Sequence, residues 1–254
     1  MKTWLWSVVA CGVAATLGGC ASNMDLKRIS EAAVMESGGR ALPYRLFAPD
    51  AVRPDHRYPL VVFLHGAGER GTDNAAQLKH GVADILRFSR EHNEPCYLLA
   101  PQCPAGVWWM LPPAGGAPAG DEPFMAVLAL TDRLLAEKPI DPQRIYITGL
   151  SMGGFGTWAA LELRPGFFAA AVPICGGGRP AAAAGFAKVP VWAFHGADDP
   201  VVPPLRSREM VDALRAAGAK PGYTEYPGVG HDSWIPAYRD AVMLSWMFKQ
   251  RRAK

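Results

Sequence analysis

The residue with the clearest chemical potential is Ser151, which lies in the segment Gly-Leu-Ser-Met-Gly at residues 149–153. This segment fits the pattern G-x-S-x-G, in which a sharp turn between a strand and a helix exposes a serine hydroxyl. Residues 144–148 read as a strand and residues 152–163 as a helix, so the pattern has the context that it requires. Because an unaided serine hydroxyl is a weak nucleophile, Ser151 needs a base within hydrogen-bond reach.

His231 is the candidate for that base. It lies in a loop between the last predicted strand, residues 223–226, and the last predicted helix, residues 235–250. From such a loop a histidine can reach the sheet edge where Ser151 is expected. The other histidines have different expected roles. We expect His65 and His195 to be structural residues at the ends of strands, and His56, His80 and His92 to be solvated.

An acid must orient the histidine and stabilise its imidazolium form. Asp198 and Asp199 directly follow the predicted strand at residues 189–194, and both lie between the serine and the histidine in the chain. Asp232, beside His231, is a less favoured rival. The pattern of residues alone leaves these carboxylates as alternatives.

Acyl transfer also needs N–H groups that bind a developing oxyanion. The backbone N–H of Met152, at the start of the predicted helix, is one candidate. The turn His-Gly-Ala-Gly at residues 65–68 follows an apolar strand, and we expect the N–H of Ala67 to be the second donor. Next to this turn, Glu69 and Arg70 are expected to form an ion pair that orders it.

Three tryptophans bear on substrate binding. Trp234 lies three residues after His231, and Trp108 and Trp109 lie in a segment rich in Gly, Pro and Ala at residues 104–123. We expect Trp108 and Trp234 to line a pocket, and the alternative is that the tryptophans seal the core beneath a long loop. The sequence has no H-x-x-x-H or C-x-x-C motif, so neither a metal nor another cofactor is expected.

Strands and helices alternate through the body of the chain, which predicts one α/β domain with a mostly parallel sheet and helices on both faces. The first two strands alternate in polarity around Gly38-Gly39, which predicts an antiparallel hairpin at the N-terminal edge. The predicted strands cover residues 29–37, 42–48, 58–64, 97–100, 144–148, 168–174, 189–194 and 223–226, and the predicted helices cover residues 75–92, 121–138, 152–163, 205–217 and 235–250.

Composition and charge exclude several classes of protein. Of 254 residues, 50% are hydrophobic and 19% charged, which excludes a disordered chain. The net charge of +3 comes without a concentrated basic face, so nucleic acid is not an expected partner. The oligomeric state is left open.

The N-terminus is typical of an export signal. Lys2 precedes an apolar run at residues 4–17, which is too short for a comfortable transmembrane helix. The segment Leu-Gly-Gly-Cys ending at Cys20 resembles a bacterial lipobox, with a plain secretory signal as the alternative. We therefore expect a lipoprotein signal peptide at residues 1–19, a lipid on Cys20 and a single catalytic domain at residues 20–254. By resemblance to Gram-negative lipoproteins, Ala21 after that cysteine points to the outer membrane, facing the periplasm or the cell surface.

Export would place the body cysteines in an oxidising compartment. Cys96 and Cys103 flank a predicted strand, and an extended strand should hold them too far apart for a disulfide. Cys175 ends a strand without a nucleophile turn and is expected to be a structural thiol.

Five segments together resemble one family. They are residues 64–71, 100–104, 149–154, 195–203 and 230–231. Their order and content are similar to those of α/β-hydrolases of the dienelactone-hydrolase and carboxylesterase branch, including secreted lipoproteins that resemble feruloyl esterases and polyhydroxybutyrate depolymerases and are often labelled predicted peptidases. The resemblance implies an α/β-hydrolase fold and a triad of Ser151, Asp199 and His231, because in that family the acid follows H-G-x-x.

The resulting hypothesis is a serine carboxylic-ester hydrolase that forms an acyl-enzyme and acts on small, aromatic or sugar-linked esters. Two alternatives stay open. One is a peptidase that uses the same residues, and the other is a non-catalytic surface lipoprotein that uses the fold to bind.

Overall fold

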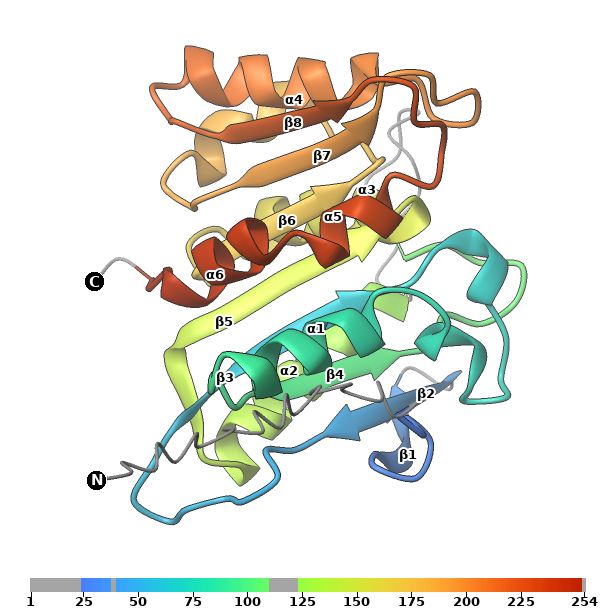
Figure 1. Cartoon of the computed structure of the whole chain (residues 1–254), viewed down its shortest axis with the longest axis vertical. Helices are drawn as coiled ribbons and strands as arrows, with labels where there is room; N and C mark the ends of the chain where they lie inside the picture. Colours follow the sequence, from blue (N-terminus) through green and yellow to red (C-terminus); the bar gives the residue numbers. More distant parts are fainter. Residues whose placement is uncertain (1–23, 38–39, 110–122, 253–254) are drawn as a thin grey trace, which may run out of the picture.

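The computed structural model describes residues 24–37, 40–109 and 123–252. Within them, strands form one sheet in the order β1-β2-β4-β3-β5-β6-β7-β8 (Figure 1). Neighbours from β4 to β8 pair in parallel, while β1 pairs antiparallel with β2, and β2 with β4. The predicted sheet and its antiparallel N-terminal strands are confirmed. The strands span Glu31–Ser37, Arg40–Phe47, Tyr58–Leu64, Tyr97–Pro101, Ile140–Leu150, Ala170–Ile174, Trp192–Gly196 and Gly222–Tyr226 for β1 to β8.

Helices cover both faces of the sheet, as predicted. Helices α1, α5 and α6 lie together on one face, and α2, α3 and α4 lie on the other (Figure 1). The α-helices span Val82–Glu91, Pro123–Glu137, Met152–Leu163, Leu205–Ala216, Trp234–Arg239 and Ala241–Lys249 for α1 to α6, and the short 3₁₀ helices η1, η2 and η3 span Ala67–Glu69, Ala76–Leu78 and Pro180–Phe186.

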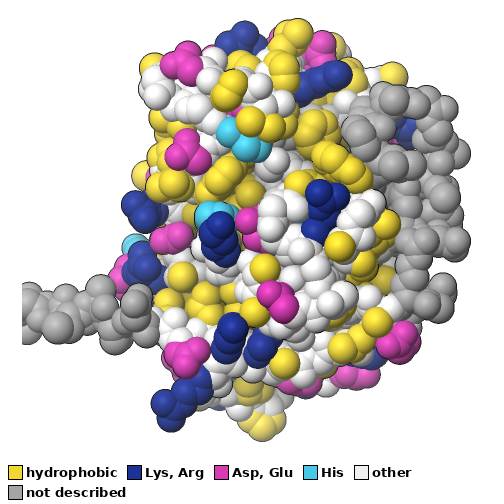
Figure 2. All heavy atoms as spheres, turned by 90° about the vertical axis from the view of Figure 1, so that its right-hand side faces the viewer, with side chains coloured by type: hydrophobic (Ala, Val, Ile, Leu, Met, Phe, Trp, Pro, Cys, Tyr) yellow, Lys and Arg dark blue, Asp and Glu magenta, His cyan; other side chains and the backbone are white. Residues whose placement is uncertain are grey.

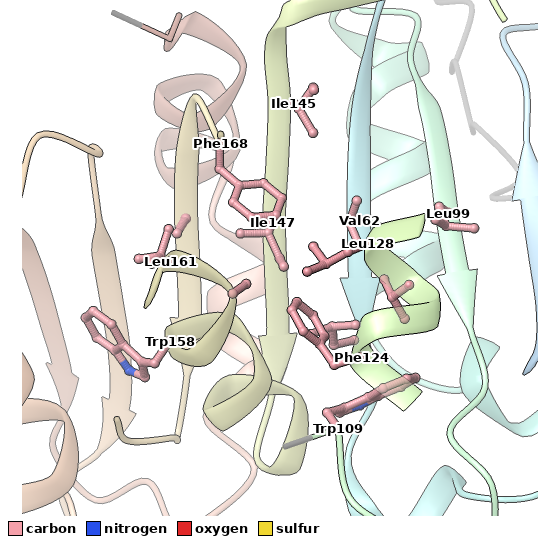
Figure 3. Packing of buried hydrophobic residues seen from close by; sticks show 14 of the residues in the cluster. Val62, Leu99, Trp109, Phe124, Leu128, Ile145, Ile147, Trp158, Leu161 and Phe168 are labelled. Atoms are coloured by element: carbon pink, nitrogen blue, oxygen red, sulfur yellow. The ribbon is translucent and has the colours of Figure 1, made fainter. Parts of the chain in front are cut away.

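The central strands are buried on both faces, which explains their continuous apolar sequence. Every residue of β3 is buried, and successive side chains alternate between two hydrophobic clusters. Val62 packs under α2 and α3, while Val61 and Phe63 pack under α1 and α5. Figure 3 shows the first cluster, where Phe124 of α2 and Trp158 of α3 point toward the strands.

Two of the predicted helices were wrong in extent, because each is two pieces. Residues 75–92 contain η2 and α1, separated by Gly81, whose φ of 73° interrupts the helix. A Cβ at Gly81 would lie 2.6 Å from the ring of Tyr238, so this turn also packs tightly. Residues 235–250 contain α5 and α6, separated by Asp240, whose carboxylate caps α6 at the N–H of Val242 at 2.8 Å.

Several predicted features lie outside the described residues. They are the signal segment 1–19, the lipidation site Cys20, the turn Gly38-Gly39 and most of the segment 104–123. Among the helices of the described ranges, none combines the length and the apolar character needed to cross a bilayer.

Candidate active site

Ser151 stands on a sharp turn between β5 and α3, at the edge of the sheet where the parallel strands end. Its φ and ψ are 53° and −116°, a sparsely populated conformation for a residue with a side chain. The surroundings fix this conformation, because the Ser151 N–H donates to the carbonyl of Ile174 at 2.9 Å. Close packing demands glycine two residues after Ser151, because a Cβ at Gly153 would collide with the backbone carbonyl of Leu64.

Ser151, His231 and Asp199 form one chain of hydrogen bonds. Ser151 Oγ lies 2.9 Å from His231 Nε2, and His231 Nδ1 lies 2.7 Å from Asp199 Oδ2. In this arrangement Nδ1–H donates to the carboxylate, which leaves Nε2 free to accept the serine proton. The structure thus brings Asp199 and Ser151, which lie 32 and 80 positions from His231 along the chain, to either side of its ring.

The environment of Asp199 keeps its carboxylate ionised. Burial alone would raise the pKa of Asp199, but the hydrogen bonds from His231 and from backbone N–H groups outweigh it and hold the pKa below its usual value. Asp199 Oδ1 accepts from the N–H groups of Val201 and Val202 at 2.8 and 2.9 Å. Neither rival carboxylate is so placed, because Asp198 and Asp232 are both exposed.

The two predicted oxyanion donors begin neighbouring helices. Ala67 is the first residue of η1 and Met152 the first of α3, and N–H groups in a first turn have no partner within their helix. The two turns are packed together, since a Cβ at Gly66 would lie 2.8 Å from the Leu150 side chain. Both N–H groups therefore belong to turns that adjoin Ser151.

The predicted ion pair between Glu69 and Arg70 was wrong. Arg70 instead donates to the carbonyls of Ala67 and Val107 at 2.9 and 3.3 Å, and its guanidinium lies 5.9 Å from the ring centre of Trp108. Glu69 is buried, and its carboxylate lies 3.7 Å from His80 Nε2. The turn is thus ordered by an arginine bound to backbone carbonyls.

His80 is not solvated as expected. It is half-buried between Glu69 and Trp234, and its ring centre lies 5.4 Å from that of Trp234. No sequence pattern indicates this contact, because residues 75–92 have helical spacing and do not reveal the break at Gly81 next to His80.

His65 has the structural role expected of it. Its Nδ1–H donates to the Gly66 carbonyl at 2.6 Å, and its Nε2 accepts from the N–H of Cys103 at 2.9 Å. Burial lowers the pKa of His65 to about 4, so the ring is neutral at pH 7. A neutral histidine thus ties the end of β3 to the segment after β4.

The tryptophans divide between the core and the site. Trp109 is fully buried, and its Nε1–H donates to the His65 carbonyl at 3.0 Å (Figure 3). Trp234 lies edge-to-face against His231, with ring centres 5.4 Å apart. Trp108 is half-buried beside Arg70. Trp109 seals the core. Trp108 adjoins the turn at residues 65–68, called the oxyanion turn below, and Trp234 adjoins His231.

Cys175 lies directly beneath the triad, a position that the sequence did not reveal. Its Sγ accepts a hydrogen bond from the Ser151 N–H at 3.3 Å, and it lies within 4.8 Å of the facing atoms of Asp199 and His231. Such spacing occurs in metal sites, but we assign none, because burial raises the pKa of this thiol well above its usual value and the other two groups bind each other. Among the described residues, Cys96, Cys103 and Cys175 are all free and buried.

Figure 2 looks onto the edge of the sheet where the parallel strands end. Histidine and acidic side chains reach the surface there among hydrophobic ones. This is the face on which a substrate would reach Ser151, whose side chain is partly exposed.

Comparisons with known proteins agree with this geometry. Residues 114–177 match the model of the prolyl oligopeptidase family. A solved structure of a thermostable esterase is 43% identical and superposes with a TM-score of 0.85, covering 89% of this chain and 64% of that one. Acyl-protein thioesterase 1 from Gibberella zeae is 26% identical over 223 residues, which are 72% of this chain and 86% of that protein.

A third relative is matched over a shorter region. Poly(3-hydroxyalkanoate) depolymerase C from Paucimonas lemoignei is 31% identical over 125 residues, which are 47% of this chain but 28% of the depolymerase. The chain therefore spans about a quarter of this relative and under two thirds of the thermostable esterase. The order of the strands, the serine turn and the similarity to esterases and thioesterases lead to one conclusion: the chain has the α/β-hydrolase fold and is similar to esterases that share it.

Proposed function

We propose that the protein is a serine hydrolase that cleaves carboxylic esters through an acyl-enzyme. The observation that carries this proposal is the unbroken hydrogen-bond chain from Ser151 through His231 to Asp199, built on a strained turn. A folded protein keeps such strain where the surroundings enforce it, and strained serines of this kind are nucleophiles. The similarity to esterases and a thioesterase supports the same chemistry.

Each group has a defined part in the proposed reaction. Ser151 Oγ attacks the ester carbonyl carbon while His231 Nε2 takes the hydroxyl proton. The N–H groups of Ala67 and Met152 bind the oxyanion of the tetrahedral intermediate. His231 then returns the proton to the leaving alcohol, and a water molecule activated by the same nitrogen releases the acid. Asp199 holds the imidazole ring and stabilises its charged form throughout. No cofactor is needed for these steps.

We infer that the substrate is a small, aromatic or sugar-linked ester, or an ester fragment of a polymer. Trp234 beside His231 and Trp108 beside the oxyanion turn offer flat apolar surfaces for such groups. The similarity to a poly(3-hydroxyalkanoate) depolymerase supports polyesters as a further substrate class to test.

Peptide hydrolysis is the second candidate, favoured by the match of residues 114–177 to the prolyl oligopeptidase family. The same triad would serve, but an amine leaves less readily than an alcohol. Comparing p-nitrophenyl acetate with an aminoacyl p-nitroanilide separates the two. We expect turnover of the ester, and turnover of the anilide alone would overturn the esterase proposal.

We further propose that the protein is an exported lipoprotein, cleaved before Cys20 and anchored in the outer membrane by a lipid on that residue, with residues 20–254 as one catalytic domain. The basis is the sequence pattern alone. Cys20→Ser should leave the precursor unlipidated, and unchanged membrane retention of that variant would count against the anchor.

The function is tested with a panel of acetyl, butyryl, feruloyl and glucuronoyl esters, using the wild type and Ser151→Ala. Hydrolysis by the wild type alone supports the proposal, and the preferred ester identifies the acyl group. If a fluorophosphonate probe labels neither protein and both behave alike, a non-catalytic binding role is indicated.

A further inference from the structure

A second histidine contacts the acid of the triad. His195, in β7, is fully buried, and its Nε2 lies 3.3 Å from Asp199 Oδ2. This is the same oxygen that accepts from His231 Nδ1. Asp199 thus accepts from two backbone N–H groups on Oδ1 and from His231 on Oδ2, and His195 Nε2 lies in close contact with Oδ2.

The contacts of His195 determine which of its nitrogens carries the proton. Nε2 also lies 2.9 Å from the Val202 carbonyl, and both neighbours of Nε2 are acceptors only, so Nε2 must be the donor. On the other side, Nδ1 lies 2.7 Å from Ser207 Oγ. Ser207 has a single hydroxyl proton, which it donates either to Nδ1 or to the Gly176 carbonyl at 3.1 Å.

Burial favours one of these two arrangements. It lowers the pKa of His195 and outweighs the opposing effects of Val202 and Asp199, so the neutral ring is favoured. A neutral ring with Nε2–H requires the Ser207 hydroxyl to donate to Nδ1. The order of donation then runs from Ser207 in α4 to His195 in β7, and on to the Val202 carbonyl in the loop that holds Asp199.

We propose that His195 is a positioning residue. Its neutral ring donates Nε2–H to the Val202 carbonyl and so fixes the loop whose Val201 and Val202 N–H groups hold Asp199 Oδ1, while the same ring nitrogen lies against Oδ2; together these contacts hold the carboxylate in the orientation that His231 requires. This rests on the proposed triad. The Nε2–H of His195 would also offset part of the negative charge on Asp199 Oδ2, so that the attraction of this oxygen for a protonated His231 is reduced. The carboxylate of Asp199 then has one orientation before substrate binds, instead of rotating between several orientations.

Other titratable groups face this pair and enter any test based on pH. His231 comes from the loop before α5, and the Cys175 thiol from the end of β6. Glu225 of β8 pairs in register with His195, but its carboxylate is engaged by Arg208 of α4. None of these groups hydrogen-bonds to His195 within the described chain, so Asp199 is its charged partner.

Two variants of His195 separate donation from packing. His195→Gln keeps an amide N–H near the position of Nε2, whereas His195→Leu removes the donor and keeps an apolar volume. Phe194→Leu is the matched control, because Phe194 is equally buried on the same strand and packs on Trp192 and Tyr226 instead of Asp199. Melting temperatures of all variants are measured alongside.

The expected result is specific to His195→Leu. Its kcat should fall about tenfold or more with KM little changed, because small misplacements of a catalytic group cost up to about 10²-fold. Its acid limb of kcat/KM should move to higher pH, since a less dispersed Asp199 charge favours protonated His231. His195→Gln should restore both quantities, and Phe194→Leu should leave the acid limb in place. An unmoved acid limb in His195→Leu, or an equal shift in Phe194→Leu, would overturn the proposal.

Ring-nitrogen NMR of the wild type decides the matter even where His195→Leu does not fold. With ¹⁵N-labelled histidine, and with His195 assigned by comparison with His195→Gln, we expect a proton on Nε2 and none on Nδ1 at pH 7. A proton on Nδ1 overturns the proposal. This readout needs no substrate, so it is distinct from a failure of the esterase proposal, which would show as absence of wild-type ester hydrolysis.

Discussion

Replacing Asp199 by asparagine tests the assignment of the acid, the member of the triad for which the sequence left alternatives. In the wild type, Oδ1 accepts from the N–H groups of Val201 and Val202, and Oδ2 accepts from His231. The amide introduced by Asp199→Asn would keep its oxygen toward the two backbone donors, so its NH₂ group would face His231. That NH₂ group can only donate, which forces the proton of His231 onto Nε2.

This change of tautomer prevents His231 from acting as a base. With Nε2 protonated, His231 has no lone pair for the Ser151 proton, although the ring stays at 2.9 Å from Oγ in the wild-type geometry. Loss of the correct tautomer costs about 10⁴ in kcat in serine hydrolases, which corresponds to about 5.4 kcal/mol of activation free energy. We therefore expect a fall of about that size for Asp199→Asn.

The assay is kcat for p-nitrophenyl acetate per mole of folded protein, with the melting temperature measured in parallel. Asp198→Asn is the control, because Asp198 is exposed and adjacent in the chain. It should behave as the wild type. A folded Asp199→Asn protein within tenfold of wild-type kcat would refute the assignment of the acid, as would an equal loss in Asp198→Asn.

Three further predictions follow from local packing and burial. Gly153→Ala should prevent soluble folding, because its Cβ would meet the Leu64 carbonyl, whereas Gly185→Ala has open space and should be tolerated; solubility and melting temperature compare the two. Trp109→Ala should lose about 3–5 kcal/mol of unfolding free energy by urea denaturation, and Trp108→Ala, which removes a partly exposed side chain, under about 1 kcal/mol. The pKa of His65 lies at about 4 in the fold and the unfolded chain binds a proton near 6.5, so the neutral buried ring contributes stability that is lost as pH falls through this window. His65→Gln should flatten the slope of unfolding free energy between pH 6.5 and 4, by up to about 3 kcal/mol in total, and an unchanged slope would contradict the assignment.

The central strands could be predicted well from the sequence, because buried parallel strands such as Tyr58–Leu64 are continuous apolar runs that few other structures produce. The serine turn could be placed too, since that turn demands glycines at fixed offsets. The ends of helices were less certain. Gly81 and Asp240 break helices through tertiary contacts and capping, which a local apolar pattern does not contain.

The candidate site was predictable where it depends on motifs and not where it depends on packing. Ser151 and His231 follow from a pattern and a loop position, but the choice of Asp199 over Asp198 required family resemblance or the three-dimensional structure. The side chains of His195, Cys175 and Glu69 contact the site through the fold, and the spacing of residues along the chain does not indicate these contacts. Glu69 and Arg70 show the same limit, since adjacent opposite charges suggested a pair that the turn does not form.

The assignment of Ser151 as the nucleophile is tested most directly by trapping the acyl group and locating it by mass spectrometry of peptides. The protein is mixed with p-nitrophenyl acetate, quenched in acid within the burst phase and digested. We expect one acetyl group on the peptide that contains Ser151, absent from Ser151→Ala. Acetylation of Cys175 instead, or ester hydrolysis that persists in Ser151→Ala without any adduct, would contradict this assignment.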